Sequence, residues 1–133
     1  MKRTCLNELQ KAIYEEFTGE YNVYDAIPKD PLYPFLIIGR DSTIDRGTKT
    51  YFAEEVNAVL SFFSLYQGYK EVKTFADEVI SRMSLAPLTM SNYEVYYRAI
   101  VLVDSFSGVN EDDREFRQVV LKYKFYVQDK GGN

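Results

Sequence analysis

The sequence predicts an α+β fold, with two helices packed on one face of an antiparallel or mixed β-sheet of about five strands. Two segments repeat apolar residues at helical spacing, and several others hold continuous or alternating apolar residues, as strands do. Aromatic residues make up 16% of the chain, which favours strands with half-buried faces. We expect the order α-β-β-β-α-β-β within a single domain that spans residues 1–133.

The first helix is predicted over residues 5–17, because apolar residues recur there at intervals of three and four. Thr4 is a suitable N-cap, and Gly19 is placed to end the helix. The recurring apolar residues are Leu6, Leu9, Ile13 and Phe17.

Two strands joined by a stiff connection are predicted next. Residues 22–25 form a short strand, and Pro28, Pro31 and Pro34 hold the connection extended, because each restricts its own φ and the residue before it. The unbroken apolar run from Phe35 to Ile38 is typical of a strand covered on both faces, so we place it in the middle of the sheet.

The segment from Arg40 to Lys49 is polar and charged, and we expect it to be an excursion between two strands that projects into solvent. A third strand is predicted over residues 51–65, with alternate residues on opposite faces. A second amphipathic helix follows over residues 72–83, and Pro87 prevents it from continuing.

The last two strands, residues 93–106 and 116–127, are joined by a turn at residues 108–113. They form a hairpin with one apolar, covered face and one face that mixes charged and aliphatic side chains. Residues 128–133 are expected to be a flexible tail.

Composition excludes most catalytic chemistry. The chain has no histidine and a single cysteine, so a serine triad, a Cys-His dyad, a zinc site and an internal disulfide cannot form within it. The net charge of −4 provides no positive field, which argues against sequence-independent phosphate binding. We therefore predict no catalytic residue, no cofactor and no metal.

An alternative, enzymatic interpretation depends on an acidic cluster that would bind magnesium for phosphoryl transfer. Its candidate ligands are Glu54, Glu55, Asp104, Asp112 and Asp113. No Asp-x-Asp pair ends an apolar strand, however, and adjacent glutamates point to opposite faces of a regular strand. A phosphate-binding loop is also excluded, because no glycine-rich turn leads into a helix.

The segment from Val23 to Arg40 is the most informative part of the sequence for function. It holds Val23-Tyr24-Asp25 at the end of a short strand, Pro28 in the connection, and Pro-Phe-Leu-Ile-Ile-Gly over residues 34–39. A helix precedes it, and an amphipathic helix and the closing hairpin follow. In these residues and this order, the chain resembles the tail-completion proteins of long-tailed bacteriophages, terminator-like subunits that join a finished tail to a head.

This resemblance implies a non-enzymatic structural protein of the virion. Proteins that resemble this one form a six-fold ring that caps the tail tube and docks it to the connector under the capsid. DNA passes through such a ring without specific binding. The implied partners are other copies of the chain, the tail tube protein and the head connector or stopper protein, and the implied location is the virion tail or neck after assembly in the host cytoplasm.

No membrane association is expected. Apolar residues follow Lys2 and Arg3 at helical spacing instead of forming a continuous run, so the sequence predicts neither a signal peptide nor a membrane-spanning segment.

Two charged segments are candidate interfaces, since a lone domain does not need them. The first carries both signs of charge and is suited to ion pairs with a neighbouring subunit, the alternative being a solvated hairpin tip. Its residues are Arg40, Asp41, Asp45, Arg46 and Lys49. The second is a turn whose acidic residues would line a ring lumen and repel DNA, the alternative being a solvated turn. Its residues are Glu111, Asp112, Asp113 and Arg114.

The sheet edges are the third candidate, because unpaired backbone groups are either blunted or used for strand addition. Tyr96, Tyr97, Tyr123 and Tyr126 could lie at such a surface, or could pair with one another inside one subunit. The alternative function is another homo-oligomeric neck protein of the stopper kind, or a small protein-binding adaptor.

Overall fold

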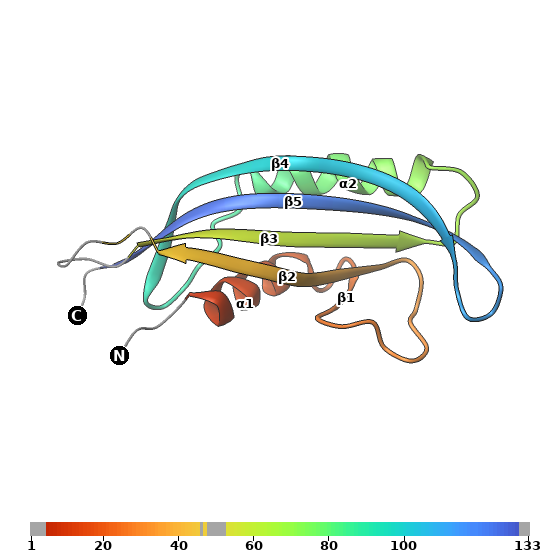
Figure 1. The fold of residues 1–133 in the computed structure, drawn as a ribbon, viewed down its shortest axis with the longest axis horizontal. Coiled ribbons are helices and arrows are strands. Elements are labelled where there is room, and N and C mark those ends of the chain that lie inside the picture. The colour runs from red at the N-terminus through yellow and green to blue at the C-terminus, as the bar shows by residue number, and fades with distance from the viewer. Residues whose placement is uncertain (1–4, 46, 48–52, 131–133) are drawn as a thin grey trace.

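The computed structural model describes residues 5–45, 47 and 53–130. These residues form two helices and a five-stranded mixed sheet, in the order that the sequence predicts (Figure 1). The elements are α1 (Leu6–Phe17), β1 (Asn22–Tyr24), β2 (Phe35–Asp45), β3 (Ala53–Ser64), α2 (Lys70–Met83), β4 (Tyr93–Val109) and β5 (Glu115–Asp129). The prediction of an α+β fold is therefore confirmed.

The strands lie in the order β1-β2-β3-β5-β4. β1 runs parallel to β2, and every other neighbouring pair is antiparallel. β1 pairs only with Phe35, Leu36 and Ile37 at the start of β2. The sheet therefore has two unlike edges, one formed by β4 alone and one formed by β1 together with the rest of β2.

Both helices pack on one side of the sheet, which we call the covered face. α1 contacts β2, and α2 contacts β5, β3 and β4 (Figure 1). On β3 this face carries Val56, Ala58, Leu60 and Phe62, all buried. Phe62 stacks on Phe75 of α2 with ring centroids 3.7 Å apart.

The buried sides of the helices confirm both helix predictions. The main buried side chains are Leu9, Ile13 and Phe17 on α1 and Val72, Phe75, Val79 and Met83 on α2. Gly19 follows α1 with a φ of +102°, a conformation in which a residue with a Cβ is strained. The glycine therefore allows the chain to turn from α1 into β1.

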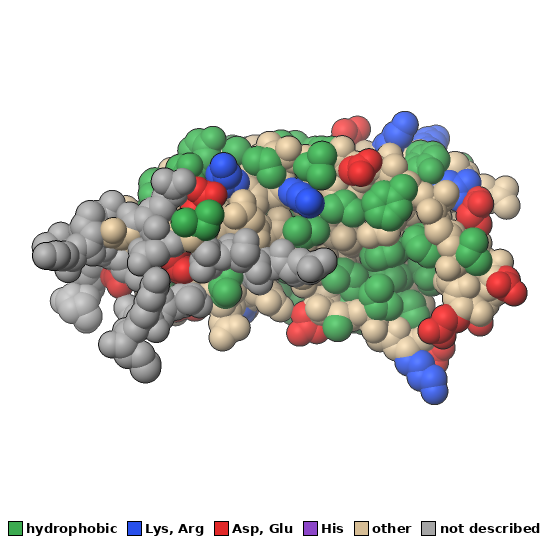
Figure 2. All heavy atoms as spheres, viewed as in Figure 1, with side chains coloured by type: hydrophobic (Ala, Val, Ile, Leu, Met, Phe, Trp, Pro, Cys, Tyr) green, Lys and Arg blue, Asp and Glu red, His purple; other side chains and the backbone are tan. Residues whose placement is uncertain are grey.

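The opposite side of the sheet, which we call the open face, carries a second and smaller cluster of aromatic rings where β2 begins. Phe35 stacks on Phe63 of β3, with centroids 4.8 Å apart and an interplanar angle of 15°. Tyr33 lies 4.9 Å from Phe35, and Phe116 of β5 lies 5.5 Å from Phe63. Figure 2 shows hydrophobic side chains gathered at this end of the open face.

This cluster accounts for the burial of the apolar run at the start of β2. Phe35 is only 1% exposed although it points to the open face, and Leu36 and Ile38 are buried against the helices. The prediction that this run is covered on both faces, between two strands, is confirmed.

The prediction that Arg40 to Lys49 leaves the sheet is wrong for its first part. β2 continues to Asp45 and pairs with β3 from Ser42 onward. A register shift between Gly39 and Ser42 places Arg40 and Asp41 opposite a single residue of β3, as in a β-bulge. Pairing with β3 therefore continues through the polar residues. The remaining residues of this candidate interface, Arg46 and Lys49, lie outside the described residues.

The turn of the closing hairpin lies later than predicted, at residues 110–114, because β4 extends to Val109. Gly108 stays within β4, where the ring of Phe116 lies over it. A Cβ added to Gly108 would stand 2.5 Å from Phe116 Cζ, so the absence of a side chain is what allows this close approach.

β5 includes Gln128 and Asp129, two residues of the predicted tail, because both pair with β4. Lys130 then donates its backbone N–H to Asn92 O at 3.0 Å. The end of the predicted tail, residues 131–133, lies outside the described residues.

Candidate assembly surfaces

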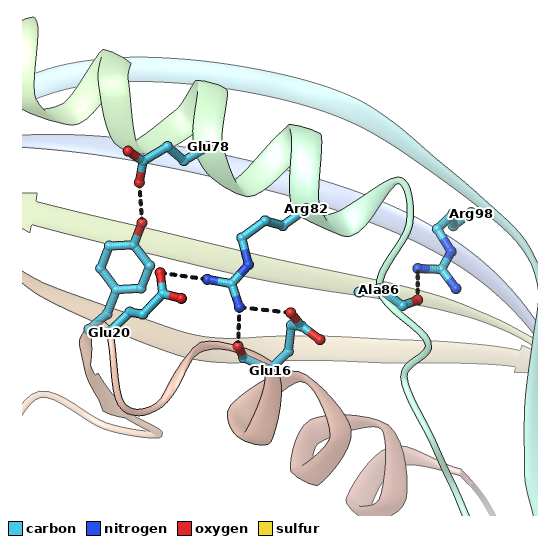
Figure 3. Close-up of polar contacts among 7 residues, drawn as sticks. Glu16, Glu20, Glu78, Arg82, Ala86 and Arg98 are labelled. Atoms are coloured by element: carbon cyan, nitrogen blue, oxygen red, sulfur yellow. Dashed lines mark hydrogen bonds and ion pairs between the residues drawn. The ribbon is translucent and has the colours of Figure 1, made fainter.

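Polar side chains between the helices form hydrogen bonds and ion pairs with one another (Figure 3). Arg82 of α2 donates to the main-chain oxygen of Glu16 at 2.5 Å and to its carboxylate at 2.7 Å, and it lies 2.8 Å from the Glu20 carboxylate. The hydrogen bond with Glu16 raises the pKa of Arg82. Tyr21 donates to Glu78 at 2.5 Å, and burial together with this bond raises the pKa of Tyr21. These groups hold α1 and its following turn against α2.

Arg98 connects β4 to the end of α2. Its Nη1 donates to the main-chain oxygen of Met83 at 2.7 Å and to that of Ala86 at 2.7 Å, the second of which is drawn in Figure 3. The last carbonyls of a helix lack partners within the helix, so this guanidinium satisfies the carbonyl of Met83, the last residue of α2, from the sheet. Burial lowers the pKa of Arg98. The position of β4 is therefore coupled to the end of α2.

The acidic residues considered as magnesium ligands do not form a cluster. Glu54 lies on the covered face, where its Oε1 accepts the backbone N–H of Cys5 at 2.9 Å, at the start of α1. Glu55 points to the open face. Within residues 5–45, 47 and 53–130, no three His, Cys, Asp or Glu side chains lie together in a way that could hold a metal. Glu54 instead caps α1 from a neighbouring strand.

The charged turn between β4 and β5 is organised by Asn110. The Asn110 side-chain oxygen accepts the backbone N–H groups of Asp112 at 2.9 Å and of Arg114 at 3.0 Å. Asp113 has a φ of +58°, in the left-handed region. Glu111, Asp112, Asp113 and Arg114 are all exposed. The main chain of the turn is thus held by Asn110, which leaves the four charged side chains at the surface.

A groove of about 360 Å³ lies between this turn and the proline-rich connection. It is lined by the aromatic cluster of the open face and by Ile27 and Val109, with Lys29, Glu111 and Asp112 among its polar residues. Asn110 Nδ2 donates to the Tyr33 hydroxyl at 3.4 Å, across the two segments that border the groove. Figure 2 shows this apolar region at the right of the open face.

The second half of β4, from Val101 to Val109, holds the longest run of exposed apolar side chains among the described residues. Its exposed apolar side chains are Val101, Leu102, Val103, Phe106 and Val109. This exposure could not be predicted from the sequence, because a continuous aliphatic run is also typical of a buried strand. The groove could not be predicted either, since it forms from segments far apart in the chain.

The four candidate tyrosines have different positions. Tyr96 and Tyr97 are exposed on β4, with ring centroids 5.9 Å and 4.8 Å from that of Tyr126 on β5. Tyr96 and Tyr97 are therefore exposed at the surface and also pair with Tyr126 within one subunit. Tyr123 is buried on the covered face and does not belong to a surface.

The chain thus has an open sheet with helices on one face, an apolar edge strand and an apolar groove, and exposed apolar surfaces of this kind are typical of a protein that binds other proteins. The family model for tail completion protein gp17 matches residues 10–128, and the chain therefore belongs to that family. It is a structural protein of the virion tail.

A solved structure has the same fold. A chain of "Virion of native gene transfer agent (GTA) particle" superimposes with a TM-score of 0.80 at 21% sequence identity, covering 96% of this chain and 99% of that chain. No curated protein sequence matches. Neither α1 nor α2, the helices of the described residues, is long and apolar enough to span a membrane.

Proposed function

We propose that this protein closes as a ring of six subunits on the end of the tail tube, stops the growth of the tube and joins it to the head connector, without enzymatic activity. The observation that carries this proposal is the match to the tail-completion family over residues 10–128. The shared fold with a chain of a GTA virion agrees with it at the level of architecture.

In this proposal, the function depends on contacts between proteins. The apolar edge of β4 and the groove supply area that becomes buried on assembly, and charged residues at their borders supply the polar rim of an interface. The segment from Arg40 to Lys49 forms ion pairs with the neighbouring subunit. The acidic turn, Glu111 to Asp113, lines the lumen and repels passing DNA. The net charge of −4 suits a channel that does not hold nucleic acid.

Removal of the gene from a phage that encodes this chain tests the proposed function. We expect filled heads and separate tails, with no joined particles, in electron micrographs of such lysates. Purified protein added to the lysate should restore joining, and micrographs of isolated tail tubes mixed with the protein should show a ring at one tube end. Normal virions in the absence of the gene, or a protein that binds no tube, would contradict the joining role.

A further inference from the structure

The outer side of β4 offers unpaired backbone groups to another strand. Its 17 residues pair with β5 on one side, and no described strand lies on the other. Proteins usually blunt such edges with lysine, proline or a short strand, but β4 is long and contains neither residue. Two register shifts disturb its first half, whereas pairing with β5 is regular from Leu102 to Val109. This second half is therefore suited to accept a strand.

The second half of β4 exposes apolar side chains on both faces of the sheet. Leu102 and Phe106 lie on the open face, and Val103 and Val109 lie on the covered side. The exposed fraction is 52% for Val101, 50% for Val103 and 63% for Val109. Asp104 is the only charged residue from Ala99 to Val109. A strand added here would gain both backbone hydrogen bonds and burial of apolar area.

The opposite edge of the sheet is also incomplete. β1 pairs with the first residues of β2, and the stretch from Ile38 to Asp45 has no described strand on its outer side. A ring built head to tail needs two different surfaces on each subunit, one for each neighbour. The two unlike edges meet this requirement, whereas pairing of β4 with β4 of another copy would make a closed dimer.

The strand directions determine how the two edges meet. β1 and β2 run in one direction, and β4 runs in the opposite direction, because β2, β3, β5 and β4 alternate. A rotation that places copies side by side in one sheet keeps these directions. β4 of one copy then lies antiparallel to β1 and β2 of the next, which is the more stable kind of pairing.

We propose that β4 of each copy pairs antiparallel with the β1–β2 edge of the next copy, so that the subunit sheets join into one sheet around the ring. This inference rests on the proposed function, which supplies the ring. The partner is a second copy of this chain, because the chain itself presents both the open edge of β4 and an unlike edge that runs in the required direction.

The available area suits a contact that forms within a ring. Pairing along the eight residues from Ile38 to Asp45, where β2 has no described strand on its outer side, gives a contact about 26 Å long. A strip about 15 Å wide along this contact hides roughly 800 Å² over two copies, which is the size of a weak contact. One such contact holds two free copies weakly, and closure of a ring strengthens it because every subunit is then held on both sides.

The test compares the full-length protein with two double variants, alone and mixed with tail tubes. The edge variant is Val101→Lys with Val103→Lys, which places two charges on the free edge. The control variant is Tyr66→Lys with Leu85→Lys, which adds the same charge at side chains that are 52% and 87% exposed and lie in the loops on either side of α2, away from both pairing edges. Circular dichroism and urea unfolding check that each variant folds. Light scattering and electron microscopy then measure rings and capped tubes.

Hydrogen exchange of the wild-type protein measures the pairing directly. We expect the amides of residues 101–109 and of residues 38–45 to exchange at least about tenfold more slowly in the ring than in the free subunit. The control variant should form rings, and the folded edge variant should remain monomeric. Protection of β4 without protection of β2, or protection of neither, would overturn the proposed pairing, whatever the edge variant does.

The outcomes separate this inference from the proposed function. If the edge variant still forms rings on tube ends, the joining function stands and the strand pairing is wrong. If the wild-type protein associates through these two edges but binds no tube, the pairing stands and the joining function is wrong. If the wild-type protein neither associates nor binds tubes, both are wrong.

Discussion

Truncation of Phe35 to alanine should be among the most damaging single changes on the open face. Burial of a phenylalanine side chain stabilises a protein by about 1.5–3 kcal/mol. Ring contacts such as those with Phe63 and Tyr33 add about 0.5–1.5 kcal/mol each. We therefore expect Phe35→Ala to lower the free energy of unfolding by about 3–5 kcal/mol, which agrees with the usual cost of such truncations.

Urea unfolding followed by circular dichroism measures this loss. With a urea m-value of about 1.5 kcal/mol/M, the midpoint should fall by about 2–3 M. Leu32→Ala is the control, since Leu32 lies in the connection just before β2 but is largely exposed, and it should change stability by less than about 0.5 kcal/mol. A loss for Phe35→Ala no larger than that of the control would show that the aromatic cluster does not stabilise the open face.

Three further changes test other contacts. Tyr123→Phe removes a buried hydroxyl without a partner among the described residues, so stability at pH 7 should be equal or higher by about 1 kcal/mol. Burial raises the pKa of Tyr123 to about 12, so the wild-type protein should lose stability as pH rises from about 10 towards that value; an alkaline titration should show a smaller loss in the variant. Glu54→Ala removes the acceptor for Cys5 N–H and should cost about 1–2 kcal/mol in urea unfolding, whereas Glu54→Gln, which keeps an acceptor, should cost less. Gly108→Ala should cost about 1–3 kcal/mol because its Cβ meets the Phe116 ring, and a double-mutant cycle with Phe116→Leu should recover part of the loss; simple additivity would argue against that clash.

The order of elements and both helices could be predicted from the sequence, because helical spacing and glycine or proline boundaries are local properties. The continuation of β2 through Arg40 and Asp45 could not. It depends on pairing with β3 and on a bulge, and neither can be recognised from the polar composition of the segment.

The candidate surfaces divide in the same way. The exposed, charged turn from Glu111 to Arg114 follows from its local composition. The exposure of β4 depends on the strand order, which places β4 at the edge of the sheet and β5 between β4 and β3. The groove needs Tyr33 and Asn110 side by side, although 77 residues separate them in the chain. Which apolar residues remain exposed is therefore a long-range property.

The position of Cys5 provides a way to watch the N-terminal helix open. This thiol is fully buried, belongs to the N-cap residue of α1, and is the only thiol in the chain. A thiol reagent can reach it only when the start of α1 separates from the sheet, so the labelling rate reports how often that separation occurs. The unmodified protein thus carries a single-site kinetic probe, and comparing its labelling rate before and after assembly would show whether docking makes the helix harder to open.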